Sequence, residues 1–407
     1  MSRSFSVTGI TFLQAKKFPL DDGSSYGRLR FQSIYRYDAR MSTPILMHQG
    51  IEVTYNNTKE RINEIDLLRF VAALAVLLFH YSFRGHAYDD LSLISYPWIV
   101  PVAKYGYLGV QLFFMISGFV IFMTAANSSL KSFAISRIVR LYPAFWACCT
   151  LTFVAILVMG GSRFSATVTQ YIANMTMLSE FMNVPSIDGA YWSIFIEIRF
   201  YLLIAILLAF KQMRNAEYFM IAWLAYAAKV AVFGADKLSI YLISEYATFF
   251  IAGASLFMVW KNGFSIIRHA TIAGSFALAI YQSLKQASIL TPVFKQDVSP
   301  MIVASIITVF FILMLLSATK KTGVIGRMNW AAVGALTYPL YLLHQFIGYM
   351  TFNSLYDKVN VHLLFWGVIS GMLVMAYAVN QLVEKPLSAK LRGILKTDAR
   401  PLQTKAD

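Results

Sequence analysis

The chain contains few charged residues and almost no cysteine. Asp, Glu, Lys and Arg make up only 14% of its 407 residues, whereas a soluble domain has about a quarter. Its two cysteines, Cys148 and Cys149, are adjacent in the sequence, which excludes a disulfide framework or a cysteine-based metal site. We also expect no secretory signal peptide, because the sequence before the first long apolar stretch is polar. These scarcities exclude most soluble and secreted classes.

Apolar residues are correspondingly frequent. They make up 58% of the chain, and the mean hydropathy is +0.58. Stretches long enough to cross a hydrocarbon core, on the order of 20 residues, recur along the sequence. The fold class predicted is all-α, a polytopic membrane bundle of about ten transmembrane helices. We place the spans at 65–83, 106–126, 144–161, 191–210, 217–234, 243–260, 269–284, 300–319, 332–352 and 361–383.

The positive charge follows the predicted topology. The formal net charge is +15, and 18 Lys and Arg residues fall in alternate connections and tails, against seven in the others. Basic residues near span ends stay in the cytoplasm, so we expect both termini there, in a cytoplasmic (inner) membrane. Nucleic-acid binding requires a clustered basic face, which is absent from this pattern.

The chain divides into three predicted regions. Residues 1–60 form a polar, basic N-terminal tail that we expect to be disordered, although translation could instead begin at Met41 or Met47. Residues 61–385 form one membrane domain, and residues 386–407 form a basic cytoplasmic C-terminal tail. The longest outside connection, 162–190, is mildly amphipathic, so it either lies along the interface or dips back toward the site.

Ionisable groups inside predicted spans are costly and are functional candidates by default. Arg69 and His80 are eleven residues apart, which places them within about 20° on one helical face and roughly 16 Å apart along the axis. Asp66 precedes Arg69 by three residues and is placed to pair with it. The alternatives are an arginine reaching lipid phosphate and a buried histidine that only satisfies its own hydrogen bonds.

Two further helices carry paired polar groups. Arg137 and Arg140 are three residues apart before Pro143, which we expect to start the next helix. Guanidinium pairs bind phosphate oxygens well, but the same pair also fits an ordinary positive connection. Ser117 and Gly118 lie in the second span, where small residues favour close helix packing.

The fourth and ninth predicted spans place polar groups at the depth of His80. Glu197 lies in the fourth span, with Ser193 one turn before it on the same face. His344 lies in the ninth span, after a kink signal at Tyr338 and Pro339. Because three helices bring ionisable groups to one depth, we predict a shared polar site.

An ordered set of motifs resembles the acyltransferase-3 family of integral-membrane O-acyltransferases. The motifs are "DLLRFVAALAVLLFH", "GVQLFFMISGFVI", "RIVRLYP", "YWSIFIEIRFY", "TYPLYLLHQ" and "VEKP". They cover about residues 61–390 and match the stand-alone form. The resemblance implies transfer of an acyl group, commonly acetyl from acetyl-CoA, to a hydroxyl of a glycan such as O-antigen or exopolysaccharide, with no metal.

The resemblance also implies roles for individual residues. His80 would be the catalytic base or a transient acyl carrier, with Glu197 orienting its imidazole or the sugar. Arg69, Arg137 and Arg140 would bind the CoA nucleotide at the inner face. His344 or Ser193 would supply hydrogen bonds to the developing oxyanion. The supporting positions in these motifs are Asp66, Trp192, Ser193, Tyr201 and His344.

Two other classes of function remain open from the sequence. A glycan or lipid transporter could use the same groups as a proton relay or substrate path, although no internal repeat supports it. A non-catalytic membrane sensor would tolerate substitution at His80 and Glu197. The sequence does not define the acceptor, the length of the acyl group or the oligomeric state.

Overall fold

A computed structural model describes the membrane part of the chain in full. It covers residues 62–397, with side chains up to Leu395, and the backbone of five short strands before them. The chain separates into two compact units, Met1–Arg61 and Ile62–Asp407.

The first unit contains the strands. β1 (Ala15–Phe18), β2 (Tyr26–Phe31) and β5 (Glu52–Asn56) form an antiparallel sheet in the order β1-β2-β5, and β3 (Ile34–Arg36) pairs with β4 (Ile45–Met47). The all-α prediction therefore applies to the second unit and not to these strands. The predicted disorder of residues 1–60 otherwise falls outside the described residues and stays a prediction.

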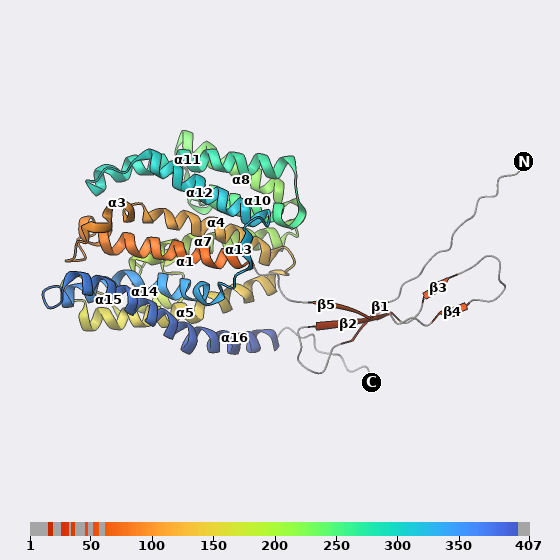
Figure 1. The fold of residues 1–407 in the computed structure, drawn as a ribbon, viewed down its shortest axis with the longest axis horizontal. Helices are drawn as coiled ribbons and strands as arrows, with labels where there is room; N and C mark the ends of the chain where they lie inside the picture. Colours follow the sequence, from red (N-terminus) through yellow and green to blue (C-terminus); the bar gives the residue numbers. More distant parts are fainter. Residues whose placement is uncertain are drawn as a thin grey trace, which may run out of the picture. The chain divides into compact units, whose positions relative to one another are not determined.

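Helices make up the described part of the second unit (Figure 1). The longer ones are α1 (Asn63–Phe79), α4 (Gly109–Ala125), α5 (Leu130–Met159), α7 (Trp192–Ala209), α8 (Ala216–Phe233), α10 (Ala247–Asn262), α11 (Ile266–Phe294), α12 (Pro300–Ala318), α14 (Ala331–Leu355), α15 (Val361–Val379) and α16 (Lys385–Thr397). The short α-helices are α2 (Gly85–Ala87), α3 (Val100–Ala103), α6 (Val168–Met175), α9 (Lys237–Tyr241) and α13 (Gly323–Arg327). The 3₁₀ and π turns are η1 (His80–Arg84), η2 (Pro97–Ile99), η3 (Gly106–Leu108), η4 (Ser179–Met182), η5 (Gly189–Tyr191), η6 (Met213–Asn215) and η7 (Asn380–Glu384).

Seven helical stretches within the described residues are long and apolar enough to cross a membrane. They are Asn63–Ala87, Gly106–Ala125, Leu130–Met159, Gly189–Ala209, Met213–Phe233, Pro300–Ala318 and Val361–Leu395. The three other predicted spans coincide with α10, α11 and α14, and α10 has only 16 residues. An integral membrane protein follows from the seven stretches, while the count of ten and the orientation stay predictions.

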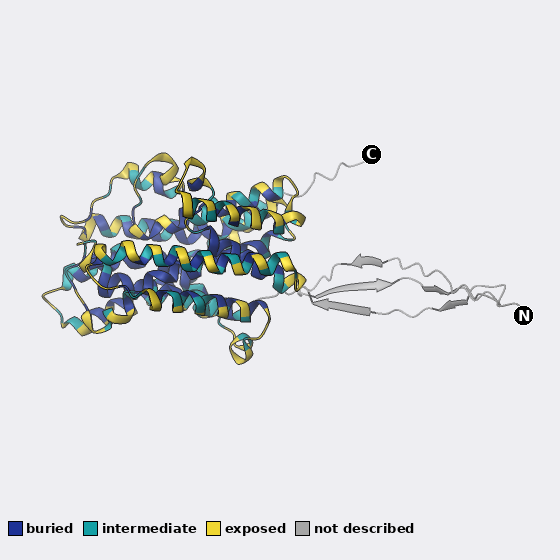
Figure 2. Cartoon of the chain, turned by 90° about the horizontal axis from the view of Figure 1, so that it is seen from above, coloured by how far each residue is buried: buried dark blue, intermediate teal, exposed yellow. Residues whose placement is uncertain are grey.

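The site helices form the middle of the bundle. α1 packs against α4 and α14, and α14 also contacts α5 and α15. On the other side, α10 packs against α4, α8 and α11. Buried residues gather between these helices, and exposed residues lie mainly on the outward surfaces (Figure 2). Polar side chains on the inward faces of α1, α4, α5, α7 and α14 therefore meet inside protein and not in lipid.

The helix containing Pro143 differs from the sequence prediction. We expected Pro143 to start a helix, but α5 begins at Leu130 and runs through the proline. Proline has no N–H to donate to the carbonyl four residues earlier, here Val139. The Ser388 hydroxyl, from α16, donates to that carbonyl at 3.0 Å. A distant partner therefore replaces the missing helical bond, and Arg137 and Arg140 lie within a continuous helix.

The long connection 162–190 turns back along α5. Trp146 Nε1 donates to the Met175 carbonyl at 2.9 Å, and the Tyr142 hydroxyl donates to the Thr176 carbonyl at 2.8 Å. Tyr142 precedes Met159, the last residue of α5, by about 25 Å along the helix. The Asn174 amide donates to the Pro185 carbonyl and accepts from the Ile187 N–H. The connection therefore packs along α5 and satisfies part of its irregular backbone internally, while its position relative to the membrane stays a prediction.

Glycines set the spacing between α4 and α10. A Cβ at Gly253 would lie 1.9 Å from the Met115 carbonyl oxygen, and one at Gly118 would lie 2.2 Å from the Phe250 carbonyl oxygen. The packing predicted around Gly118 is confirmed. We expect Gly253→Ala to lower the melting temperature of the purified protein, because overpacking typically costs about 1–3 kcal/mol.

The matched control for this variant is Gly371→Ala on α15. No atom lies within 4 Å of a Cβ built at Gly371, and alanine is favoured over glycine in a helix by roughly 0.5–1 kcal/mol. Its melting temperature should stay equal or rise. An unchanged melting temperature for Gly253→Ala would contradict the close packing of α4 and α10.

Candidate active site

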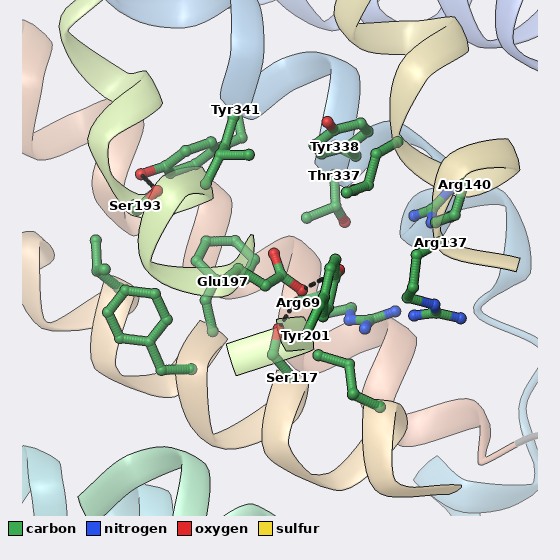
Figure 3. A pocket seen from close by; sticks show the side chains of 16 residues that line it. Arg69, Ser117, Arg137, Arg140, Ser193, Glu197, Tyr201, Thr337, Tyr338 and Tyr341 are labelled. Atoms are coloured by element: carbon green, nitrogen blue, oxygen red, sulfur yellow. Dashed lines mark hydrogen bonds between the residues drawn. The ribbon is translucent and has the colours of Figure 1, made fainter. Parts of the chain in front are cut away.

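A polar cavity of about 100 Å³ lies between α1, α4, α5, α7 and α14. Its charged lining consists of Arg69, Arg137, Arg140 and Glu197 (Figure 3). The hydroxyls of Ser117, Ser193, Tyr201, Thr337, Tyr338 and Tyr341 also line it. The structure thus brings together most of the polar residues that the sequence singled out.

Three arginines form the basic side of the cavity. Arg69 comes from α1, and Arg137 and Arg140 come from successive turns of one face of α5. Figure 3 shows their guanidinium groups on the same side of the cavity. Within the described residues, Arg137 Nε is buried without a hydrogen-bond partner. A buried guanidinium N–H without a partner indicates a site for an anionic oxygen.

Arg140 is held by an ion pair and an aromatic ring. Its Nη1 lies 2.5 Å from Glu384 Oε1, and its guanidinium lies 5.7 Å from the Tyr338 ring centroid. The Asn380 amide donates to the other Glu384 oxygen at 2.9 Å. The C-terminal end of the bundle therefore fixes Arg140, whereas Arg137 stacks over the Phe133 and Tyr201 rings.

Glu197 lies in the cavity but does not orient His80. Its Oε1 accepts from the Ser117 hydroxyl at 2.9 Å and from the Tyr201 hydroxyl at 2.7 Å (Figure 3). Tyr201 lies one turn along α7 from Glu197, and Ser117 comes from α4. Of the two roles predicted for Glu197, orienting the His80 imidazole is therefore wrong, because Ser117 and Tyr201 hold the Glu197 carboxylate on the arginine side. The other role, orienting the sugar, stays a prediction.

His344 is the residue that contacts His80. His344 Nε2 lies 3.2 Å from His80 Nδ1, and the two rings meet edge-on with centroids 4.9 Å apart. Both side chains are buried. Of the three groups predicted to share one polar site, His80, Glu197 and His344, the two histidines are in direct contact, although 264 residues separate them in the chain.

Carbonyl acceptors determine which nitrogens carry hydrogen. His344 Nδ1 lies 2.8 Å from the Tyr341 carbonyl oxygen, and His80 Nδ1 lies 2.8 Å from the Val76 carbonyl oxygen. A carbonyl only accepts, so both Nδ1 atoms carry the hydrogen of the neutral ring. His344 Nε2 is then an acceptor facing His80 Nδ1–H. His80 Nε2 keeps its lone pair, and the predicted oxyanion role of His344 is not supported.

The backbone around His80 departs from an ordinary α-helix. η1 is a π-helical turn that starts at His80. Such turns insert one residue into a helix and often mark functional positions. The Tyr81 hydroxyl donates to the His344 carbonyl at 2.6 Å, which ties η1 to α14 directly beside the histidine pair.

Tyr341 joins the cavity to the histidine pair. Its hydroxyl lies 2.7 Å from Ser193 Oγ on the cavity wall, and its ring centroid lies 5.5 Å from that of His344. Trp192 is 39% exposed and does not line this cavity. Asp66 is half-buried beside Gly334, where a Cβ on Gly334 would contact its carboxylate.

Sequence comparison decides the family. Residues 62–381 match the family described as acyltransferase domain, the acyltransferase-3 family. The chain belongs to the acyltransferase-3 family. The matched range contains every site residue predicted from the sequence, and the family resemblance seen in the motifs is thereby confirmed.

One curated relative of this acyltransferase-3 chain is Nodulation protein 10 of Rhizobium leguminosarum bv. viciae. The two are 28% identical over 166 residues, which cover 36% of this chain and 44% of the relative. The aligned region thus spans less than half of the relative's length. No solved structure matches.

Two buried carboxylates, Glu384 and Asp188, were not singled out from the sequence. Glu384 was quoted only within the "VEKP" motif, and its contact with Arg140 spans 244 residues. Asp188 is fully buried and accepts from the Ala190 and Phe346 N–H groups. Burial raises the pKa of Asp188 to about 7, and the two N–H bonds only partly oppose this rise. The sequence signal that could have identified Asp188 was its position directly before the helical turn that begins at Gly189.

Among residues 62–397, no group of three or more His, Cys, Asp or Glu side chains is arranged to hold a metal ion. Cys148 and Cys149 are both buried in α5. Their surroundings fit the packing role expected from the sequence.

Proposed function

We propose that this chain is a membrane O-acyltransferase that moves an acetyl group from acetyl-CoA to a hydroxyl of a cell-surface saccharide. We place it in the cytoplasmic membrane, with about ten spans and both termini in the cytoplasm. The observation that carries this proposal is the His80–His344 pair, which leaves the lone pair of His80 Nε2 fixed on a buried side chain in an acyltransferase-3 domain.

His80 Nε2 suits the role of general base. An imidazole titrates near neutral pH and can take the proton of a hydroxyl as that oxygen attacks a carbonyl carbon. In the transfer, a bond forms between the acceptor oxygen and the acetyl carbonyl carbon, and the thioester C–S bond breaks. The proton removed by His80 is then returned to the departing thiolate. His344 fixes the ring so that this nitrogen keeps one orientation.

The arginine side of the cavity supports an anionic donor. Arg69, Arg137 and Arg140 line one side of a cavity whose nearby carboxylates are Glu197 and Glu384. The unpartnered Arg137 Nε suits a phosphate oxygen of CoA. Arg69 and His80 are about 16 Å apart along α1, so a thioester arm would follow the helix from one to the other.

The cavity itself is small for such a donor. Its volume of about 100 Å³ is below the roughly 300–1,000 Å³ of ordinary ligand sites. Donor binding in this proposal therefore requires the lining side chains to separate. Arg140 and Glu384 bridge α5 and η7, and their ion pair is one contact that would hold those elements together.

Acetyl-CoA consumption by the purified full chain is the direct test. We expect release of free CoA that depends on added saccharide, and a mass increase of one acetyl group on that saccharide. Isotopically labelled acetyl-CoA identifies the donor carbon in the product. Saccharide transport without any CoA release would contradict the proposal.

His344 should act as a positioning residue. We expect His344→Leu to lower kcat by about 10–100-fold, because the His80 ring loses the acceptor that helps fix it. The KM for acetyl-CoA should stay unchanged, because His344 is not on the arginine side. The measurement is steady-state kinetics with pH profiles for His344→Leu, for the comparison variant His344→Gln and for the parent.

His344→Gln is the conservative comparison for this effect. Its amide oxygen can accept from His80 Nδ1–H, so part of kcat should return. An equal loss in His344→Gln and His344→Leu, with an unchanged pH profile, would contradict the positioning role and point to a packing effect.

A further inference from the structure

A second and larger cavity lies away from the histidine pair. Its volume is about 580 Å³, within the roughly 300–1,000 Å³ typical of small-molecule sites. It lies among the start of α4, the end of α8, the start of α10, the end of α11 and a face of α7. The Lys and Arg distribution predicts these helix ends on the outer side.

Neutral hydrogen-bonding groups dominate the polar lining of this second cavity. Gln111, Gln286, Ser244 and Ser283 line it, and the Gln111 and Gln286 amides lie 2.9 Å apart. The charges at the second cavity offset one another. Arg199 pairs with Glu180 at 2.9 Å, and the lining contains one further negative residue, Glu245, and one further positive residue, Lys285. Amides and hydroxyls both donate and accept, which suits a ligand rich in hydroxyls and not a simple ion.

Two buried hydroxyls in this wall have no partner. Ser244 and Ser283 are each 2% exposed, and within the described residues their Oγ atoms make no hydrogen bond. Buried polar atoms in proteins are nearly always paired. Both serines line the second cavity, but their Oγ atoms have almost no accessible surface, so a hydrogen-bonding ligand there would supply the missing partners once the side chains rotate toward it.

Helix α7 separates the second cavity from the first. Ile194, Glu197 and Tyr201 line the first cavity, while Ile196 and Arg199 line the second. These sets follow two faces of one helix, because residues three and four apart share a face. The cavities are therefore on either side of a single helix.

Three aromatic rings form the rest of the partition. Phe114 lines the first cavity and Tyr246 lines the second, with ring centroids 5.1 Å apart. Trp192 contacts both, at 6.4 Å from Phe114 and 5.6 Å from Tyr246. One aromatic layer thus separates a ligand in the second cavity from the first, and Trp192 lies in that layer.

We propose that the second cavity binds the saccharide part of the acceptor, with Ser244, Ser283 and Gln286 bonding its hydroxyls. This inference rests on the proposed function, because the acceptor is what acyl transfer requires from the outer side. The aromatic layer of Phe114, Trp192 and Tyr246 then separates the acceptor from the donor cavity until a hydroxyl reaches the transfer site.

Calorimetry on the purified full chain tests the inference. The probes are tri-N-acetylchitotriose and maltotriose, which differ in amide content and share many hydroxyls. We expect at least one to bind, and the double variant Ser244→Ala, Ser283→Ala to weaken its Kd by about tenfold, as the loss of two hydrogen bonds implies. Its melting temperature should be equal or higher, because the substitutions remove unpartnered hydroxyls.

Ser288→Ala is the matched control on the same helix. Ser288 is exposed on α11 and bonds the Lys285 carbonyl, and its variant should bind the oligosaccharides as the parent does. Equal binding by the double variant and the parent would overturn the inference. Failure of the parent to bind either oligosaccharide would also overturn it.

The two proposals fail in different ways. Acetyl-CoA binding and CoA release are measured on the same samples. Saccharide binding that depends on Ser244 and Ser283 without CoA release would overturn the proposed acyl transfer and keep the saccharide site. CoA release with a saccharide KM unaffected by the double variant would overturn the saccharide site alone.

Discussion

His80→Ala should lower the rate of acyl transfer by about 10²–10⁴-fold, the usual contribution of a positioned general base. His80 Nε2 is the lone pair left by the hydrogen bonds of His80 Nδ1 to Val76 and His344. Its removal leaves the arginine side intact, so the affinity for acetyl-CoA should not change. The measurement is kcat with saturating acetyl-CoA, together with calorimetry of donor binding.

His86→Ala is the control for the loss of a nearby imidazole. His86 is exposed and its Nδ1 contacts the Ser92 carbonyl at 3.2 Å. We expect near-parent activity for His86→Ala, and a membrane-inserted protein for both variants. Normal acetylation by a fully expressed His80→Ala protein would remove the proposed mechanism.

Arg69→Ala should raise the KM for acetyl-CoA by roughly 10–150-fold, since a hydrogen bond to a charged group is worth about 1.5–3 kcal/mol. Arg69 lines the cavity beside Arg137 and Arg140 (Figure 3). The loss should be smaller at high ionic strength, because salt already screens the remaining charges. Steady-state kinetics with varied acetyl-CoA measure it.

Two further variants test whether the effect depends on the Arg69 guanidinium group or only on positive charge. Arg69→Lys keeps the charge but loses the guanidinium fork, so its KM should fall between those of the parent and Arg69→Ala. Arg327→Ala removes an exposed cation from α13 and should leave the KM unchanged. An equal rise in KM for Arg327→Ala would mean that overall charge, and not the cavity, attracts the donor.

Local sequence predicted much of the site because several of its members lie on single helices. Arg137 and Arg140 are one turn apart on α5, and Ser193 and Glu197 are one turn apart on α7. Helical periodicity fixes such pairs without any tertiary information. The same arithmetic placed Arg69 and His80 on one face of the first helix.

Partners between helices were not predictable in the same way. The sequence left Glu197 to orient either His80 or the sugar. In the structure His80 contacts His344, while Glu197 bonds Ser117 and Tyr201. Depth alone does not determine which faces meet. The rotation of α14 against α1 decides the contact, and that rotation depends on packing along the whole interface.

The helix through Pro143 and the packing of the 162–190 connection also could not be predicted from local sequence. The rule that proline starts a helix failed at Pro143 because Ser388 bonds the Val139 carbonyl that the proline leaves free. The sequence did not predict the packing of the 162–190 connection along α5, which depends on contacts from Tyr142 and Trp146. In both cases a partner distant in sequence changed the local preference.

The sequence by itself determined that this chain is a membrane helix bundle of the acyltransferase-3 type, because hydropathy, charge distribution and motif order are properties of short segments. Only the tertiary structure decided which lone pair of His80 stays free and which carboxylate holds Arg140. It alone formed the cavity that Ser244 and Ser283 line. The physical reason is that hydrogen-bond satisfaction and cavity shape depend on how helices far apart in the sequence pack together.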